Sequence, residues 1–297
     1  MINVGLLGGG GLVGETYRRL LKNHPHFKLI YTPSRDELGD LDKAKGCALL
    51  FSALPSKGAA IYEPLYAKRG FPVFSSASCH RMEKDIPLII PEINPEHFDW
   101  IEKQQKNRNW KGFIVSKPNC TLQSILLPLF PLHQRYRLKG VVVTYLQARS
   151  GAGKGFHLEE NIIPYIAGEE EKSEKEVHKI LDDPSIKISC HSLRVPVQEG
   201  HLATVSATFL EKPPLDEVKK IWKGYDPVNY LEEEDRPQPA LDLGDGMKVQ
   251  IGRLRSCPLM DLRFVALSHN LIRGAAGGGL LTALTWYQNA QASLFIS

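Results

Sequence analysis

Cysteine is scarce in this sequence, and its spacing excludes two common uses of the residue. The five cysteines, Cys47, Cys79, Cys120, Cys190 and Cys257, are odd in number, lie far apart and form no CxxC pair or Cys/His cluster. We therefore expect neither a disulfide framework nor a metal site. Scattered thiols suit a reducing compartment, so we expect a cytoplasmic protein.

Long apolar runs and a strong charge imbalance are also missing. No apolar run reaches the roughly 20 residues that cross a bilayer, and the N-terminus has neither a basic region nor a small-residue cleavage site. The net charge of +4 is small, and no basic stripe is interleaved with aromatic residues. We therefore expect no membrane partner and no nucleic-acid partner, and we interpret the N-terminus as a strand.

The chain has enough residues for two domains, and its pattern of elements changes near the middle. The 297 residues exceed one average domain. In the first half, apolar strand-like runs alternate with helical patterns, which indicates βαβ units and a parallel sheet. The expected strands are 2–8, 27–32, 47–54, 72–76 and 112–116, and the expected helices are 12–23 and 58–68.

Beyond Gln147 the apolar runs come in pairs that are joined by short turns. The pairs are 186–197 with 201–210, and 247–255 with 261–268. Alternating runs of this kind indicate antiparallel hairpins. A helical pattern at 275–292 ends the chain. The predicted fold class is α/β: a Rossmann-type parallel sheet domain plus a mixed α+β domain.

Three glycines follow the first expected strand and open the first expected helix. Gly8, Gly11 and Gly14 let the backbone turn tightly, and the helix start offers free N–H groups to a pyrophosphate. The alternative is a glycine-rich turn with no ligand. After the second strand, Ser34 and Arg35 stand where an NAD-selective domain usually has an acid, which favours NADP, although Asp36 beside Arg35 argues the other way.

A single thiol lies between an apolar strand and an apolar helical pattern, in "SKPNCTLQS". If a helix begins at Asn119 or Cys120, its positive end lowers the pKa of the thiol and favours the thiolate. A lone cysteine is otherwise a small buried hydrophobe. Downstream, Arg194 and His201 flank a turn. A thiol, an imidazole and a dinucleotide motif together suit hydride transfer to a thioester.

Motifs along nearly the whole chain resemble one family. They include "GLLGGGGLVG", "FSALPS", "SSASCHR", "KPNCT", "YLQARSGAG", "ENIIPYIAGEEEK", "RVPVQEGH" and "HNLIRGAAGG". In this order they resemble aspartate-β-semialdehyde dehydrogenase, and more closely its archaeal/fungal-type branch. The resemblance implies NADPH-dependent reduction of L-4-aspartyl phosphate to L-aspartate 4-semialdehyde, with release of phosphate.

The resemblance also implies roles for individual residues. Cys120 would be the nucleophile, His201 the acid/base and Gln147 the group that orients the acyl intermediate. Arg194 would bind the substrate carboxylate and Glu176 its ammonium. The phosphate would be bound by Arg81, Asn119 and Lys179. Without the family, Glu176 and Lys179 would be interpreted as a surface i,i+3 pair.

For the cofactor NADP, the resemblance implies a larger set of residues and a division of the chain. The set is Gly8, Gly11, Leu12, Val13, Gly14, Ser34, Arg35, Ser52, Pro55, Ser150, Gly151 and Asn270. Residues 1–119 with 270–297 would form the NADP-binding domain, and 120–269 the catalytic and oligomerisation domain of a homodimer or homotetramer. Segment 35–46 is shorter than the family usually has where it shapes the adenine pocket.

Two classes of alternative function remain open. The first is a sister reductase on the same scaffold, acting on N-acetyl-γ-glutamyl phosphate or malonyl-CoA. An acetylated amine needs no carboxylate partner, so Glu176 favours the free amino acid, and a phosphate pair of Arg81 and Lys179 favours an acyl phosphate. The second is a non-enzymatic NADPH-sensing protein. It would have no reason to hold Cys120 and His201 together with their neighbours.

Overall fold

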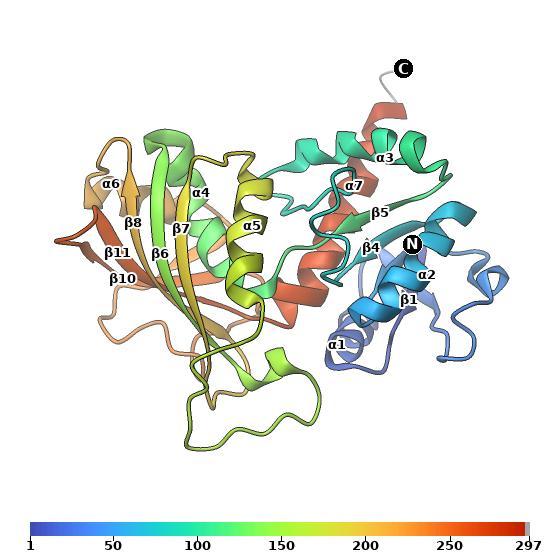
Figure 1. Cartoon of the computed structure of the whole chain (residues 1–297), viewed down its shortest axis with the longest axis horizontal. Helices are drawn as coiled ribbons and strands as arrows, with labels where there is room; N and C mark the ends of the chain where they lie inside the picture. Colours follow the sequence, from blue (N-terminus) through green and yellow to red (C-terminus); the bar gives the residue numbers. More distant parts are fainter. Residues whose placement is uncertain (295–297) are drawn as a thin grey trace. The chain divides into compact units, whose positions relative to one another are not determined.

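The computed structural model describes residues 1–294, with side chains through residue 291, and divides into two compact units (Figure 1). The first unit is Met1–Pro118 together with the chain from Ala275 onward. The second unit is Asn119–Gly274. None of the helices within the described residues is both long and apolar enough to cross a lipid bilayer.

The first unit is built on a five-stranded sheet in which every pairing is parallel. Its strands are β1 (Ile2–Leu7), β2 (Phe27–Tyr31), β3 (Leu49–Ser52), β4 (Pro72–Ser75) and β5 (Phe113–Ser116), in the order β2-β1-β3-β4-β5. The three short strands β3, β4 and β5 are almost entirely buried and largely apolar, because both faces of the sheet are covered there. The predicted parallel sheet is confirmed.

Helices cover both faces of this sheet, and each face has its own core. One core joins β1, β3 and β4 to α1 (Leu12–Leu21), α3 (Trp100–Arg108) and α7 (Gly277–Leu294), and its members include Tyr17, Phe51 and Leu280. The other joins the opposite face to α2 (Ser56–Arg69) through Ala59 and Tyr66. In this sheet β2 lies on one side of β1 and β3 on the other, so the strand order reverses between β1 and β3. Ligands of doubly wound sheets bind outside the carboxyl ends of the strands at such a point.

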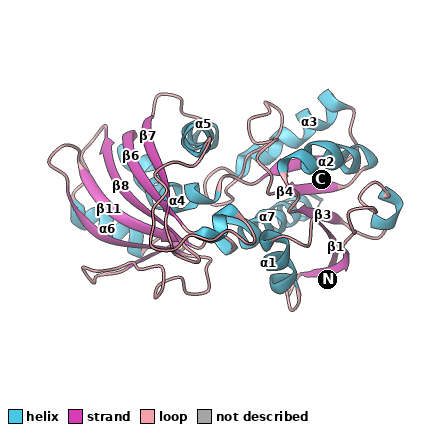
Figure 2. Cartoon of the chain, turned by 60° about the horizontal axis from the view of Figure 1, so that its bottom comes forward, coloured by secondary structure: helices cyan, strands magenta, loops and turns pink. Residues whose placement is uncertain are grey.

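The second unit has a six-stranded mixed sheet. Its strands are β6 (Leu138–Gln147), β7 (Lys187–Arg194), β8 (His201–Phe209), β9 (Val228–Tyr230), β10 (Val249–Ser256) and β11 (Leu262–Ser268), in the order β7-β6-β8-β11-β10-β9. The helices of this unit are α4 (Gln123–Tyr136), α5 (Glu169–Leu181) and α6 (Leu215–Lys223). They pack beside the curved sheet (Figure 2).

One of the two predicted hairpins is wrong. The runs at 186–197 and 201–210 do form strands β7 and β8, but these do not pair with each other. Instead β6 lies between them, parallel to β7 and antiparallel to β8. The alternating pattern of a strand reports one buried face and not the identity of its neighbour. The second hairpin, β10 with β11, is antiparallel and is confirmed.

Candidate active site

The thiol of Cys120 lies at the start of a helical segment, as its sequence context predicts. Cys120–Leu122 form a single 3-10 turn that leads directly into α4. Asn119 caps this turn, and its side-chain oxygen accepts the backbone N–H of Thr121. The sulfur therefore lies at the positive end of the helix, where backbone N–H groups can stabilise a negative charge.

His201, the first residue of β8, lies within hydrogen-bond distance of this sulfur. Its Nε2 is 3.2 Å from Cys120 Sγ, and its side chain is fully buried. The backbone N–H of Ala148 donates to Nδ1 at 3.1 Å. A neutral imidazole that accepts at Nδ1 carries its proton on Nε2, so His201 directs an N–H at the sulfur.

The electrostatics of the site keep His201 neutral. Burial, followed by the positive charge of Arg194 and the proximity of His269, lowers the pKa of His201 to about 3. The hydrogen bond at Nδ1 also favours the neutral form. A protonated imidazolium would carry an N–H at Nδ1, and this N–H would point at the backbone N–H of Ala148. The geometry is that of a neutral imidazole whose N–H could stabilise a thiolate at Cys120.

The end of β6 brings the remaining catalytic candidates to the same place. Gln147 is the last residue of β6 and pairs in register with Arg194, the last residue of β7. Arg194 is buried, and its guanidinium donates to the carbonyl of Ala148 at 2.7 Å. A Cβ added at Gly151 would lie 2.6 Å from Arg194 Nη1 and 3.0 Å from His201 Cε1. A larger residue at position 151 would therefore have to displace the Arg194 guanidinium and crowd the His201 ring.

Glu169, which the sequence analysis did not single out, joins this cluster. Its Oε2 accepts the side-chain amides of Asn119 at 2.8 Å and Gln147 at 3.4 Å, and its Oε1 pairs with Lys172 at 3.1 Å. Burial raises the pKa of Glu169, but the Asn119 bond and the Lys172 charge outweigh it and the pKa is lowered. An ionised carboxylate therefore lies beside two predicted site residues.

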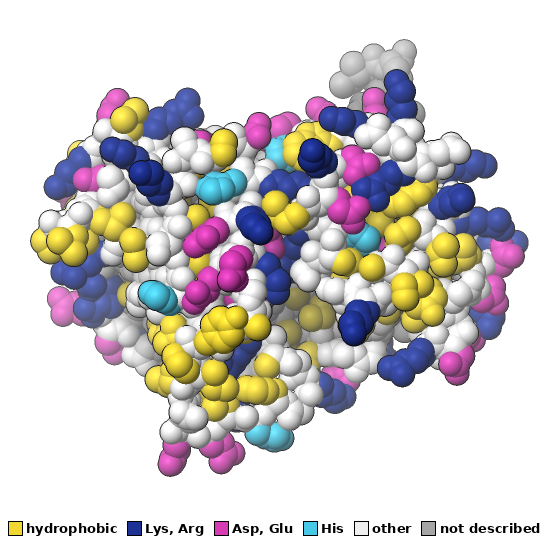
Figure 3. Space-filling model, viewed as in Figure 1, with side chains coloured by type: hydrophobic (Ala, Val, Ile, Leu, Met, Phe, Trp, Pro, Cys, Tyr) yellow, Lys and Arg dark blue, Asp and Glu magenta, His cyan; other side chains and the backbone are white. Residues whose placement is uncertain are grey.

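Glu176 and Lys179 stand further along α5. Glu176 is 1% exposed, and its Oε2 accepts the backbone N–H of Asn119 at 2.7 Å. It therefore holds the backbone just before Cys120, and its role toward a substrate ammonium stays a prediction. The missed pair Glu169 and Lys172 has the same i,i+3 spacing, and this repetition in "EEEKSEKEVHK" was the available signal. Acidic side chains gather on the surface over α5 (Figure 3).

In the first unit, the glycine turn between β1 and α1 has the shape that a pyrophosphate needs. Gly8 has a φ of +79°, and a Cβ there would lie 2.8 Å from the backbone of Ala53. A Cβ at Gly14 would lie 2.3 Å from the carbonyl oxygen of Gly8, whereas Gly10 and Gly11 face open space. No side chain caps the helix start at Gly11, Leu12 and Val13. These observations fit a dinucleotide phosphate.

The other predicted cofactor residues divide between the units. Ser52 ends β3, and Pro55 is the N-cap residue just before α2, in the segment next to the glycine turn. In the second unit, Asn270 donates to Ser150 Oγ at 2.9 Å and accepts the backbone N–H of Gly200 at 3.0 Å. Both side chains are buried. Their roles toward the cofactor stay predictions.

Arg81, Ser34 and Arg35 belong to the first unit as well. Arg81 is 8% exposed, and its guanidinium donates to the carbonyl of Ser76 at 3.3 Å. Ser34 and Arg35 follow β2 and are exposed. The hydroxyl of Ser34 donates to the carboxylate of Glu37. Ser34, which is predicted to bind the 2′-phosphate of NADP, is thus already bonded to an anion of the same chain, the Glu37 carboxylate.

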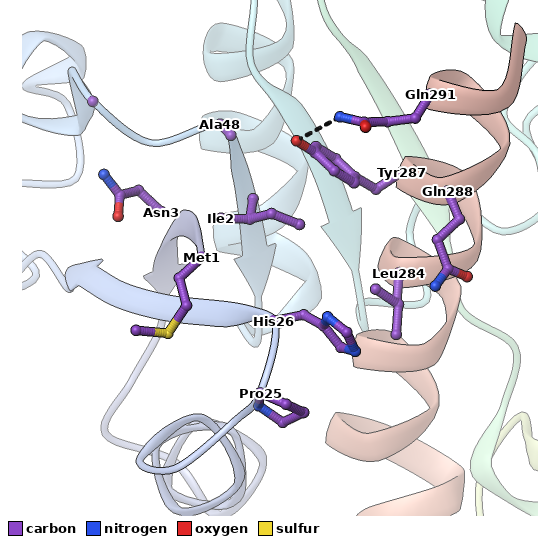
Figure 4. Close-up of a pocket in the computed structure, with 11 residues that line it drawn as sticks. Met1, Ile2, Asn3, Pro25, His26, Ala48, Leu284, Tyr287, Gln288 and Gln291 are labelled. Atoms are coloured by element: carbon purple, nitrogen blue, oxygen red, sulfur yellow. Dashed lines mark hydrogen bonds between the residues drawn. The ribbon is translucent and has the colours of Figure 1, made fainter. Parts of the chain in front are cut away.

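A cavity of about 660 Å³ in the first unit lies away from the predicted cofactor residues. Figure 4 shows that Met1, Ile2 and Asn3 line it together with Leu284 and Tyr287 of α7. It therefore lies at the amino end of β1. Ligands of doubly wound sheets bind at the carboxyl ends of the strands, so this cavity does not belong to the predicted cofactor site.

Two family models match this chain. "Semialdehyde dehydrogenase, NAD binding domain" matches residues 3–101, and "Semialdehyde dehydrogenase, dimerisation domain" matches residues 129–273. The fold and the thiol–imidazole pair thus define a dinucleotide-linked semialdehyde dehydrogenase, an oxidoreductase.

Individual relatives narrow this class. Aspartate-semialdehyde dehydrogenase of Archaeoglobus fulgidus is 38% identical, over 95% of this chain and 96% of its own length. Malonyl CoA reductase (NADP) of Metallosphaera sedula is 31% identical, over 95% and 96%. The crystal structure of aspartate semialdehyde dehydrogenase with NADP from Candida albicans has a TM-score of 0.84 and 31% identity, covering 96% of this chain and 98% of that one. This chain belongs to the aspartate-semialdehyde dehydrogenase family.

Proposed function

We propose that this protein is an NADP-dependent, phosphorylating aspartate-semialdehyde dehydrogenase. It would reduce L-4-aspartyl phosphate to L-aspartate 4-semialdehyde in the biosynthesis of lysine and diaminopimelate, threonine and methionine. The observation that carries the proposal is the 3.2 Å approach of His201 Nε2 to Cys120 Sγ at a helix start. The family membership supplies the substrate class.

The residues of the second unit suit each step of this reaction. The Cys120 thiolate attacks the acyl carbon, a C–S bond forms, and the C–O bond to phosphate breaks to leave a thioester. NADPH, when bound, would supply the hydride that reduces the thioester. The resulting thiohemiacetal oxyanion would collapse to the aldehyde as the C–S bond breaks and Cys120 leaves as the thiolate. Backbone N–H groups at the helix start would stabilise the oxyanion, and His201 would hold and move the proton at the sulfur.

The charges of the substrate match the charges of the site. Arg194 would bind the α-carboxylate through its planar guanidinium. Glu176, or Glu169 beside Asn119 and Gln147, would pair with the ammonium group. Arg81, Asn119 and Lys179 would bind the phosphate, and Lys172 is a further cation for it.

NADP is the proposed cofactor, held by the glycine turn and by Ser34 and Arg35. The Candida albicans relative was solved with NADP, and the Metallosphaera sedula relative is named as an NADP enzyme. The five cysteines form no disulfide within the described residues, which supports a reducing cytoplasm. The match to a dimerisation domain supports a homodimer or homotetramer.

A direct assay distinguishes the proposed substrate from its rivals. Phosphate-dependent reduction of NADP⁺ is measured with L-aspartate 4-semialdehyde, and beside it with N-acetyl-glutamate semialdehyde. Oxidation of NADPH by malonyl-CoA is measured in parallel. We expect turnover with the first substrate to exceed both others by at least about 100-fold, because only it presents an ammonium and a carboxylate together. Faster turnover of malonyl-CoA would assign the chain to its Metallosphaera sedula relative's activity.

A further inference from the structure

The carboxylate of Glu37 is surrounded by donors that would suit a phosphate. The backbone N–H and the hydroxyl of Ser34 both donate to Oε2 at 2.9 Å. Lys43 Nζ donates to Oε1 at 2.8 Å. One backbone amide, one hydroxyl and one ammonium around an anion are a common environment for a phosphate monoester.

This cluster of Ser34, Glu37 and Lys43, hereafter the β2 clamp, lies where a dinucleotide places its adenosine ribose. Ser34 follows the carboxyl end of β2, and β2 pairs in parallel with β1, which leads into the glycine turn. A Cβ at Gly9 would lie 2.7 Å from Thr32 Cγ2, so the end of β2 contacts the turn itself. In this fold, residues at the end of β2 meet the 2′ position of the ribose.

The fold of the segment does not depend on the Glu37 carboxylate. Backbone bonds form its turns, from Glu37 N to Ser34 O and from Asp40 N to Glu37 O. Leu38 is buried, and its carbonyl accepts the hydroxyl of Tyr66 at 3.1 Å. The Glu37 side chain is 42% exposed and can turn outward while the backbone keeps its place.

The carboxylate is charged at every pH at which the protein would work. The bond from Lys43, followed by those from the Ser34 backbone and hydroxyl, lowers the pKa of Glu37 to about 2. A 2′-phosphate approaching Ser34 and Lys43 therefore meets a full negative charge that occupies the same donors. NAD has no such phosphate, and the carboxylate can accept its ribose 2′-hydroxyl.

We propose that Glu37 determines the cofactor preference by competing internally with the 2′-phosphate of NADP for the β2 clamp. In the free protein Glu37 occupies Ser34 and Lys43, and NADP displaces it, whereas NAD leaves it in place. The preference for NADP is then weaker than Ser34, Arg35 and Lys43 alone would give. This inference rests on the cofactor site of the proposed function and adds two residues, Glu37 and Lys43, to it.

Binding of two nucleotide fragments tests the proposal without turnover. Isothermal titration with 2′,5′-ADP and with 5′-AMP is carried out on the native protein and on Glu37→Gln, Lys43→Met and the control Glu102→Gln. Glu102 is an exposed glutamate on α3, so its substitution makes the same change in net charge. We expect Glu37→Gln to tighten binding of 2′,5′-ADP about tenfold, because the competing negative charge is removed. Binding of 5′-AMP should stay unchanged, because the amide oxygen of glutamine can still accept the ribose 2′-hydroxyl.

The other variants separate a local effect from a general one. Lys43→Met should weaken binding of 2′,5′-ADP about tenfold and spare 5′-AMP, and Glu102→Gln should change neither. The NADPH/NADH ratio of kcat/KM should rise in Glu37→Gln. Equal changes for both fragments, or no change, would overturn the competition while leaving the proposed function intact. If neither fragment binds to the native protein or to any variant, the proposed cofactor site is wrong, and the proposed competition is wrong as well.

Discussion

A single backbone N–H decides what the imidazole of His201 can do. Because Ala148 donates to Nδ1, the nitrogen that faces Cys120 carries the proton. A histidine in this state stabilises a thiolate by donation and then gives or recovers a proton at Nε2. Arg194, whose charge also acts on Cys120, adds to the stabilisation of the thiolate.

Replacement of His201 by asparagine should damage the chemical step more than binding. Asparagine keeps a side-chain amide but cannot exchange a proton, so we expect kcat to fall by roughly 10²–10⁴ with little change in KM for the substrate. Steady-state kinetics with L-aspartate 4-semialdehyde measure this. A rise in KM with kcat unchanged would instead show that His201 contributes to substrate binding.

The lowered pKa of His201 also predicts the pH dependence of the native enzyme. The group titrates at about 3, below its ordinary 6.5, so it is neutral throughout the range from pH 5 to 9. We therefore expect no limb near pH 6.5 in kcat/KM that arises from His201. A limb there that disappears in His201→Asn would show that the imidazole ionises in the working range.

Gly151 should be nearly as sensitive as the catalytic candidates. A methyl group at this position would come within 2.6 Å of Arg194 and 3.0 Å of His201, and both would have to move. Gly151→Ala should lower kcat/KM by about 100-fold, since small misplacements of reacting groups are costly. Gly140→Ala is the control, because its nearest neighbour would lie at an ordinary 3.5 Å. Equal activity of both variants would show that a methyl group at position 151 does not displace Arg194 or His201.

At the residue scale, sequence motifs predicted the thiol and its helix start but not all of its neighbours. "PNC" placed Cys120 after a strand, and the structure has a helical turn there. Glu169 was missed because Glu176 offers the same spacing to a lysine, and only the folded chain shows that Glu169 reaches Asn119 and Gln147. Spacing identifies a helical face but not what that face meets.

At the scale of elements, the strand order β7-β6-β8, which replaces the predicted hairpin of β7 with β8, brings the site residues together. If β7 and β8 were neighbours, Arg194 and His201 would meet across a tight turn. Instead β6 separates them, and its end, Gln147, pairs with Arg194 while Leu146 pairs with Leu202. Three strand ends therefore converge on one point. Local patterning predicts β7 and β8, but β6 (Leu138–Gln147) is not among the expected strands. The convergence follows from pairings between distant segments, which one sequence does not reveal.

A buried ionic network in the first unit makes stability depend on pH. His80 Nε2 lies 3.2 Å from Glu63, and Nδ1 lies 2.5 Å from Glu83, which also pairs with Arg108. Burial lowers the pKa of His80, but the bonds and charges of Glu63 and Glu83 outweigh it and raise the pKa to about 9. The network thus holds a charged histidine between α2 and the loop after β4.

The sign of the effect follows from the raised pKa. The stabilisation is fully present below pH 6.5, the unfolded value, and is lost as the pH rises through about 9. We expect His80→Gln to cost roughly 2–3 kcal/mol of unfolding free energy at pH 6 and much less at pH 10. Urea denaturation at both values measures this, with the exposed His157→Gln as control. A deficit that is equal at both pH values would refute the charged network.

At the scale of the whole molecule, the first unit consists of two segments that are far apart in the sequence. The first unit takes back the end of the chain from Ala275, and α7 packs with β4 on one face of its sheet. An apolar helical pattern at 275–292 predicts a helix. That it covers the first sheet follows from the family motif "HNLIRGAAGG" and not from periodicity, because the sequence of α7 is only weakly amphipathic.

The open face of the sheet in the second unit is where we expect two copies to associate. Val142 on β6 is 48% exposed there, and a shallow cavity beside it is lined by Thr144, Thr204 and Arg255. Because a charge on this face would have to be buried in a dimer, Val142→Glu should dissociate the assembly.

Light scattering after size exclusion should give at least twice 33.2 kDa for the native protein and 33.2 kDa for the variant. Ile61→Glu, on the exposed surface of α2, should keep the native mass. A native mass of 33.2 kDa would contradict the proposed oligomer, and dissociation by Ile61→Glu alone would move the interface to the first unit.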